Sequence, residues 1–246
     1  MRALLLAASL LLAAFSAAAK PTVVAVYAPK HVLFVGNSYS IYNNGIYTHV
    51  REFARAADAE AAKAQIFRLT AISAANLKDQ DGAVTAMLKQ NKWDVVVLQG
   101  NSSEPLPEDK ARVESFRESA RRYDKEVRAA GGRTAFFMTW AYQDKPAMIV
   151  PIQEAYESIG NELGALVVPV GLAFARSIKE RPGLVLHVKD KQHPALAGTY
   201  LAAATFYAAL YGKSPVGSPY AAELDPEVAK YLQGIAWETV KEYYGR

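Results

Sequence analysis

The stretch WDVVVL, from Trp93 to Leu98, is apolar at every position except Asp94. A strand with helices on both faces has no solvent-facing side, so its sequence loses the alternation of polar and apolar residues. We therefore predict that 93–98 is a central strand of a parallel sheet. Similar short runs rich in β-branched and aromatic residues predict further strands at 31–35, 66–72, 134–139, 166–170 and 184–188.

Segments with helical spacing separate these runs. They predict helices at 47–57, 77–88, 108–130, 148–163, 194–211 and 225–244. Strands that alternate with helices of this length form right-handed crossovers, which place a parallel sheet between two layers of helices. The sequence therefore predicts an α/β fold, with no repeat or linker to divide it.

The composition excludes several classes of function. The chain has 246 residues, of which 28 are Lys or Arg, 24 are Asp or Glu and none is Cys. A chain without cysteine has no disulfide, no thiolate nucleophile and no cysteine ligand for zinc or iron. The formal net charge of +4 is too small to predict nucleic-acid binding. We predict no metal and no cofactor, and we expect a small-molecule substrate as the partner.

Residues 1–19 have the three parts of a secretory signal peptide. Arg2 gives the positive start, 4–15 is a mostly apolar run, and 16–19 is a stretch of small residues that ends before Lys20. An uncleaved anchor is the alternative, although the apolar run is short for a bilayer. We expect a secreted or periplasmic protein whose residues 20–246 form one domain, with no stable membrane insertion after cleavage.

Polar residues directly follow three of the predicted strands, at the carboxyl ends where catalytic groups are expected. In parallel sheets the reactive groups lie beyond the carboxyl ends of the strands. Gly36-Asn37-Ser38 follows the first strand, Gln99-Gly100-Asn101 follows the central one, and Asp190 to His193 follows the last. These segments supply a hydroxyl, a carboxamide, a carboxylate and an imidazole, which are the groups that acyl transfer requires.

A catalytic triad is the interpretation that joins these groups. Ser38 would be the nucleophile, His193 the base, and Asp190 the carboxylate that orients the imidazole. The backbone N–H of Ser38 and the side-chain amide of Asn101 are candidate donors to an oxyanion. Each segment has a simpler reading as a turn or a helix cap, so the order and the strand-end positions together carry the hypothesis.

These segments resemble the conserved blocks of the SGNH hydrolases, also called GDSL-type esterases. Gly36-Asn37-Ser38 is similar to the first block, Asp190 and His193 match the fifth, and Asn101 is the surviving residue of the third. The resemblance implies a three-layer α/β/α sandwich with about five parallel strands in a flavodoxin-like sheet. It also implies that the loop after the second strand gives a backbone N–H to the oxyanion, and we assign that role to Ala74.

Ala74 departs from the family pattern, because the second block normally has a glycine there. If the loop requires a positive φ, an alanine would be strained in it. Asn37 also replaces the usual aspartate of the first block. Because of these departures, a degenerate enzyme with reduced or altered activity stays an alternative.

Four side chains are candidates for substrate contact. Asn37 and Tyr39 flank the predicted nucleophile, and Trp140 and Tyr142 follow the fourth strand. The two latter rings would either stack on a sugar or an acyl chain or pack in the core. His31, His49 and His187 lack ligand spacing and are interpreted as structural.

The function expected from these features is an exported serine esterase that works through an acyl-enzyme. The resemblance suggests a small acyl ester, such as an O-acetyl group on a carbohydrate. A non-catalytic or degenerate ligand-binding protein on the same fold is the alternative. A flavodoxin-like cofactor binder is disfavoured, because the loop after the first strand lacks a run of glycines that would bind phosphate.

Overall fold

The computed structural model describes residues 20–25 and 27–246, so the predicted signal peptide at 1–19 lies outside the described residues. Five strands form one sheet: β1 (His31–Gly36), β2 (Ile66–Ala71), β3 (Val95–Leu98), β4 (Arg133–Phe137) and β5 (Leu166–Val168). Their order is β2-β1-β3-β4-β5 and every neighbouring pair is parallel. This is the order of flavodoxin-like sheets, so the predicted fold class is confirmed.

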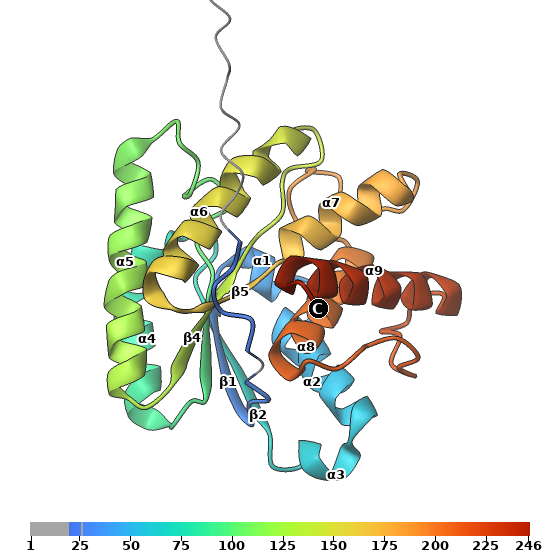
Figure 1. Cartoon of the computed structure of the whole chain (residues 1–246), viewed down its shortest axis with the longest axis horizontal. Helices are drawn as coiled ribbons and strands as arrows, with labels where there is room; N and C mark the ends of the chain where they lie inside the picture. Colours follow the sequence, from blue (N-terminus) through green and yellow to red (C-terminus); the bar gives the residue numbers. More distant parts are fainter. Residues whose placement is uncertain (1–19, 26) are drawn as a thin grey trace, which may run out of the picture.

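Helices cover both faces of the sheet (Figure 1). One layer contains α4 (Asp81–Gln90), α5 (Lys110–Ala129) and α6 (Ile149–Leu163), and the other contains α2 (Ile46–Ala57), α7 (Val170–Glu180), α8 (Leu196–Tyr211) and α9 (Pro226–Tyr244). Short helical turns complete the fold: α1 (Ser38–Ile41), α3 (Ala59–Ala62), η1 (Leu77–Gln80) and η2 (Pro146–Met148). Among the described helices, none combines the length and the apolar composition that a membrane span requires.

The two faces of β1 belong to two separate cores. Val32 and Phe34 pack in the cluster that includes α2, α8 and α9, whereas Leu33 and Val35 pack in the cluster beneath α4, α5 and α6. Successive strand residues point to opposite faces, so a strand buried on both sides is apolar throughout. The same rule explains the four consecutive buried residues of β3.

The central strand begins two residues later than predicted, at Val95. Asp94 instead uses its side chain, which accepts hydrogen bonds from the N–H groups of Lys30 at 2.7 Å and His31 at 2.9 Å. The one polar residue in the apolar run therefore holds the start of β1 beside β3.

The predicted strand at 184–188 is wrong. The segment forms only an isolated bridge, from His187 to Pro194, within its own loop. The backbone of a strand needs a neighbour on the sheet edge, and this segment instead pairs with the return of the same loop. The helix α7 was not predicted, because the apolar run at 166–170 continues without a polar break into its first turn.

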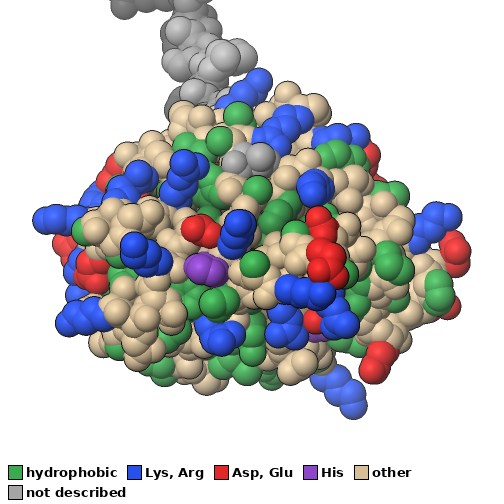
Figure 2. Space-filling view, turned by 90° about the horizontal axis from the view of Figure 1, so that it is seen from below, with side chains coloured by type: hydrophobic (Ala, Val, Ile, Leu, Met, Phe, Trp, Pro, Cys, Tyr) green, Lys and Arg blue, Asp and Glu red, His purple; other side chains and the backbone are tan. Residues whose placement is uncertain are grey.

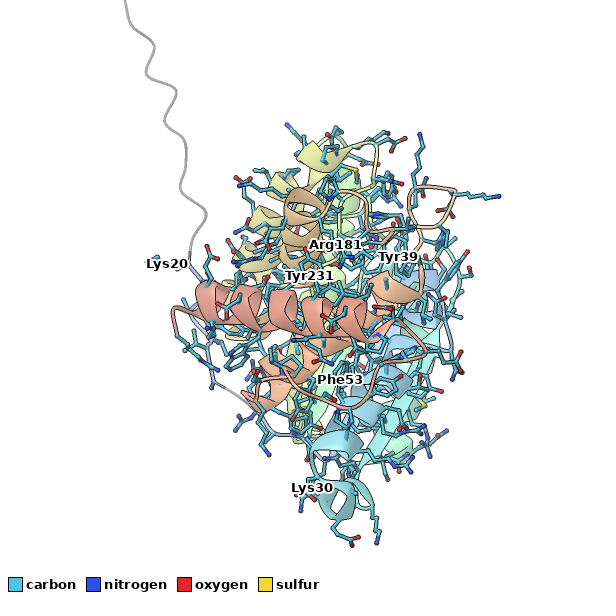
Figure 3. The ribbon with its side chains drawn as sticks, turned by 90° about the vertical axis from the view of Figure 1, so that its right-hand side faces the viewer. Lys20, Lys30, Tyr39, Phe53, Arg181 and Tyr231 are labelled. Carbon is cyan, nitrogen blue, oxygen red and sulfur yellow. The ribbon has the colours of Figure 1, made fainter. Side chains whose placement is uncertain are left out.

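The carboxyl ends of the strands lie at one end of the molecule. Lys30 precedes β1 and Tyr39 follows it, and the two lie far apart along the strand direction (Figure 3). Figure 2 looks onto the amino ends of the strands, where Lys and Arg side chains are scattered among apolar and acidic ones. The order of the sheet reverses between β1 and β3, and a crevice at that point is the usual binding place in such folds.

The two described chain ends lie near each other, on a side of the molecule away from Tyr39. Lys20 and Tyr243 line the same cavity of about 720 Å³. The side chain of Asn161 on α6 fixes the amino end: its Oδ1 accepts the N–H of Thr22 at 2.8 Å, and its Nδ2 donates to the carbonyl of Lys20 at 3.1 Å. Lys20 and Tyr39 lie on opposite sides of the molecule (Figure 3).

Candidate active site

Ser38 is placed by the turn that connects β1 to α1. Asn37 caps α1, because its Oδ1 accepts the N–H of Tyr39 at 3.1 Å. Asparagine is one of the preferred residues at this position, since its short side chain replaces a missing helical acceptor. Ser38 is thus the first residue of the helical turn and is partly exposed, directly beyond the end of β1.

The side chain of Gln99, which follows β3, holds this turn through two hydrogen bonds. Its Nε2 donates to Oδ1 of Asn37 at 2.6 Å, and its Oε1 accepts the hydroxyl of Ser40 at 2.6 Å. A Cβ on Gly36 would lie 2.4 Å from that Oε1, so only glycine leaves room for the contact. Gln99 has no predicted role in the site, although its position directly after a fully buried strand is a signal that could have indicated one.

Asp190, His193 and Ser38 form one chain of hydrogen bonds. Nε2 of His193 lies 2.8 Å from Oγ of Ser38, and Nδ1 of His193 lies 2.6 Å from Oδ2 of Asp190. A proton on Nδ1, directed at the carboxylate, leaves Nε2 as the acceptor for the serine hydroxyl. The arrangement gives the serine a base and gives the base a fixed orientation.

Asp190 is held in its ionised form. Partial burial would raise the pKa of its carboxyl, but hydrogen bonds from the N–H groups of Gln192 and His193, and from the His193 ring, bring the pKa below its ordinary value. Both backbone N–H groups donate to Oδ1 at 2.9 Å, so Oδ2 is left for the imidazole. The carboxylate therefore orients both the loop and the ring.

Three contacts from other segments hold the loop that carries His193. The indole Nε1 of Trp140 donates to the carbonyl of Gln192 at 2.9 Å, and Nδ2 of Asn43 donates to the carbonyl of Pro194 at 3.0 Å. The ring of Tyr42 stacks on the His193 imidazole, with centroids 4.5 Å apart and planes at 13°. These contacts restrict the imidazole to the position beside Ser38.

Three of the predicted substrate contacts lie beneath the site instead. Trp140 is fully buried and is stacked between Tyr39 at 4.5 Å and Phe174 at 4.3 Å. Tyr39 and Asn37 are only 4% and 3% exposed, and Asn37 uses its side chain to cap α1. The substrate role is therefore corrected for these three, because their burial leaves almost no surface for a substrate to contact.

Tyr142 differs from those three. Its side chain is partly exposed and its hydroxyl lies 2.9 Å from Oγ of Ser102, so it joins the loops that follow β3 and β4. It remains a candidate for substrate contact. His31, His49 and His187 each contact protein acceptors or hydroxyls, in line with structural roles, and burial lowers the pKa of both His49 and His187.

The candidate oxyanion donors come from three neighbouring loops. Within the described residues, the backbone N–H groups of Ser38 and Ala74 donate to no protein acceptor. Nδ2 of Asn101 donates to the carbonyl of Ala74 at 3.1 Å, and the amide has a second N–H. Ala74 has a φ of 60°, which is the left-handed conformation that the usual glycine would adopt without strain.

No model of a known protein family matches the chain, and no curated protein matches it by sequence. Solved structures do match. One is a protein from Slackia heliotrinireducens that is described as an SGNH hydrolase by assignment. It is 24% identical, with a TM-score of 0.60 over 73% of this chain and 98% of that one. A DUF4886 family protein from Bacteroides uniformis is 18% identical, with a TM-score of 0.68 over 87% of this chain and 95% of that one.

An acetylxylan esterase from Geobacillus stearothermophilus is also similar. It is 19% identical, with a TM-score of 0.60 over 77% of this chain and 97% of that one. These comparisons show that the chain has the fold of the SGNH hydrolases, as the sequence motifs predict.

Ala74→Gly should stabilise the protein. Glycine removes the strain of the left-handed φ while keeping the backbone N–H, so we expect the free energy of unfolding in urea to rise by up to about 1 kcal/mol. Ala222→Gly, at a φ of 50° in the loop before α9, is the matched control and should give a similar gain. Destabilisation by Ala74→Gly alone would contradict the left-handed conformation.

Asp190→Asn should destabilise the protein in a pH-dependent way. The pKa of Asp190 is lowered by folding, so its ionised form stabilises the native state above the ordinary pKa of a carboxyl. That stabilisation is lost as the pH falls through the lowered value. Melting temperatures of wild type and variant should differ at pH 7, and the difference should shrink as the pH is lowered below about 4, the ordinary pKa of an aspartate. A difference that stays constant below that pH would refute the argument.

Proposed function

We propose that this protein is a serine hydrolase that cleaves small acyl esters. The observation that carries the proposal is the hydrogen-bonded chain from Ser38 through His193 to Asp190, with a separation of 2.8 Å between Oγ and Nε2. Two backbone N–H groups that have no acceptor among the described residues, those of Ser38 and Ala74, lie in the adjoining loops, where a developing negative charge would need them.

The chain supplies each group that the reaction needs. Oγ of Ser38 attacks the carbonyl carbon while Nε2 of His193 takes the hydroxyl proton. The N–H groups of Ser38 and Ala74 and the amide of Asn101 bind the tetrahedral oxyanion. The C–O bond to the alcohol then breaks, and His193 returns the proton to the departing oxygen.

Water completes the cycle. It attacks the acyl group on Ser38, with His193 again taking a proton, and the acid and the free serine are released. Asp190 stabilises the imidazolium that forms in both halves of the reaction. These steps use groups of the chain and water alone.

An acetyl ester on a carbohydrate is the substrate that we propose. The support is the similarity in fold to an acetylxylan esterase, together with the position of the triad at the exposed carboxyl edge of the sheet. Tyr142, partly exposed on the loop after β4, is the aromatic side chain that could contact a sugar ring there.

Hydrolysis of p-nitrophenyl acetate tests the function. Ser38→Ala should lower kcat by about 10³-fold or more, since the nucleophile is lost. A fluorophosphonate probe should form one covalent adduct at Oγ of Ser38 in the wild type, with loss of fluoride. Ser214→Ala, at an exposed turn, is the control and should keep both the rate and the adduct.

Equal rates for wild type and Ser38→Ala, with no adduct at Ser38, would contradict the esterase. That result would favour a ligand-binding protein with the same fold, in which the alanine in place of the second-block glycine marks the loss of activity.

We also propose that residues 1–19 direct export and are removed. The support is the three-part pattern in the sequence. Amino-terminal sequencing of the protein recovered outside the cytoplasm should find Lys20 as the first residue. A first residue within 1–19 would indicate that the segment is retained as an anchor.

A further inference from the structure

A carboxylate without any exposed surface lies between the loops that follow β2 and β3. Glu104 is 0% exposed. The backbone N–H of Leu77 donates to its Oε1 at 3.1 Å and to its Oε2 at 3.0 Å, and the N–H of Asn101 donates to Oε2 at 2.7 Å. Its own N–H donates to the carbonyl of Asn101 at 2.9 Å. All the side-chain contacts are accepted hydrogen bonds, which suits a carboxylate.

The two loops that Glu104 joins are those that carry candidate oxyanion donors. Leu77, the first residue of η1, lies three residues after Ala74 and ends the loop that follows β2, and Asn101 lies in the loop that follows β3. The loops also touch directly, through the bond from Nδ2 of Asn101 to the carbonyl of Ala74. One buried side chain thus contacts the backbone of both loops, close to the Ala74 N–H and the Asn101 amide.

This arrangement is costly for stability alone. Burial raises the pKa of the Glu104 carboxyl, and the hydrogen bonds from Asn101 and Leu77 oppose that rise only in part. A well-packed apolar side chain avoids such a penalty. Gly100 makes the space, since a Cβ there would lie 2.9 Å from Oε2 of Glu104 and 2.9 Å from the ring of Phe116.

Arg112 does not replace this contact. Its guanidinium joins Oδ1 of Asn76 at 2.9 Å to Oγ of Ser103 at 2.8 Å, further out on the same two loops. It spans the loops through side chains, whereas Glu104 binds their backbone next to the candidate donors. Of these two side chains, Glu104 is therefore the one that binds the backbone of both loops.

We propose that Glu104 is a positioning residue for the oxyanion site, a role that rests on the proposed esterase function. Its carboxylate holds the loops of Ala74 and Asn101 at the separation that lets both donate to one oxygen. It is not a catalytic residue, because it has no exposed surface from which to touch a substrate. Hydrogen bonds to a transition-state oxyanion weaken steeply when their donors shift, so the effect is expected in kcat.

Glu104→Gln tests the proposal, because it keeps the shape of the side chain while turning one acceptor into a donor. With p-nitrophenyl acetate we expect kcat to fall by roughly 10- to 100-fold and KM to change by less than about twofold. Glu157→Gln is the matched control. Glu157 is also buried, at 2% exposed, but it lies on α6, where its carboxylate accepts from Gln153 of the same helix at 2.9 Å. This variant should keep the wild-type kcat.

Amide hydrogen exchange gives a second measurement that does not depend on activity. In Glu104→Gln, the amides of Leu77 and Asn101 should exchange faster than in the wild type, while they should be unchanged in Glu157→Gln. If Glu104→Gln does not fold, Glu104→Asp, which keeps the charge on a shorter side chain, should show the same two changes to a smaller degree.

The outcomes separate this proposal from the function on which it rests. If hydrolysis depends on Ser38 and Glu104→Gln keeps the wild-type kcat, the positioning role is overturned and the esterase stands. If the kcat values of Glu104→Gln and Glu157→Gln fall equally, the effect is general destabilisation and the positioning role is again overturned. If the wild type hydrolyses no ester, the proposed function fails. Independently of activity, amide exchange at Leu77 and Asn101 that is the same in Glu104→Gln as in the wild type would refute the loop contact.

Discussion

The hydrogen bond from Nε2 of Gln99 to Oδ1 of Asn37, 2.6 Å long, connects the carboxyl ends of two neighbouring parallel strands. Asn37 then begins the helical turn on which Ser38 lies, and Gln99 begins the loop that leads to Asn101. Because the bond is buried, water does not compete with it. The relative position of the serine and the adjoining loops therefore follows from the pairing of β1 with β3, deep in the sheet.

The other half of the site depends on a stack of aromatic rings. Tyr39, Trp140 and Phe174 pack face to face in the core, and the indole N–H of Trp140 reaches the loop of His193. A packed core is stiff, and a side chain held by packing on both faces transmits that stiffness to its hydrogen-bond partner. The stack thus serves stability and orientation together, which explains why such large rings are buried beside a polar site.

The fold could be predicted from the sequence because its main signals are periodic. A strand that is covered on both faces has an apolar run, and a helix has regularly spaced apolar residues. Both patterns can be recognised without knowing which elements pack against each other. The segment at 184–188 shows the limit, since its composition is that of a strand but its partner is the returning half of its own loop. Composition does not specify which backbone a segment pairs with.

The site was partly predictable for the same reason. Ser38, Asp190 and His193 follow short motifs, and the structure places them within hydrogen-bond distance of one another. The burial of Trp140 depends on rings from α1 and α7 that no local pattern relates to it. Likewise, Glu104 is an unremarkable acidic residue in a loop until the approach of a second loop brings the N–H of Leu77 to it.

The amino end of the described chain leaves the domain on the side opposite Tyr39, where Asn161 fastens it to α6. Any support attached there, whether a resin, a carrier protein or a lipid surface, would face the back of the molecule. Tyr39, the neighbour of Ser38, would then lie on the far side from the support. Immobilisation through this end is accordingly expected to leave the Ser38 segment accessible to solvent.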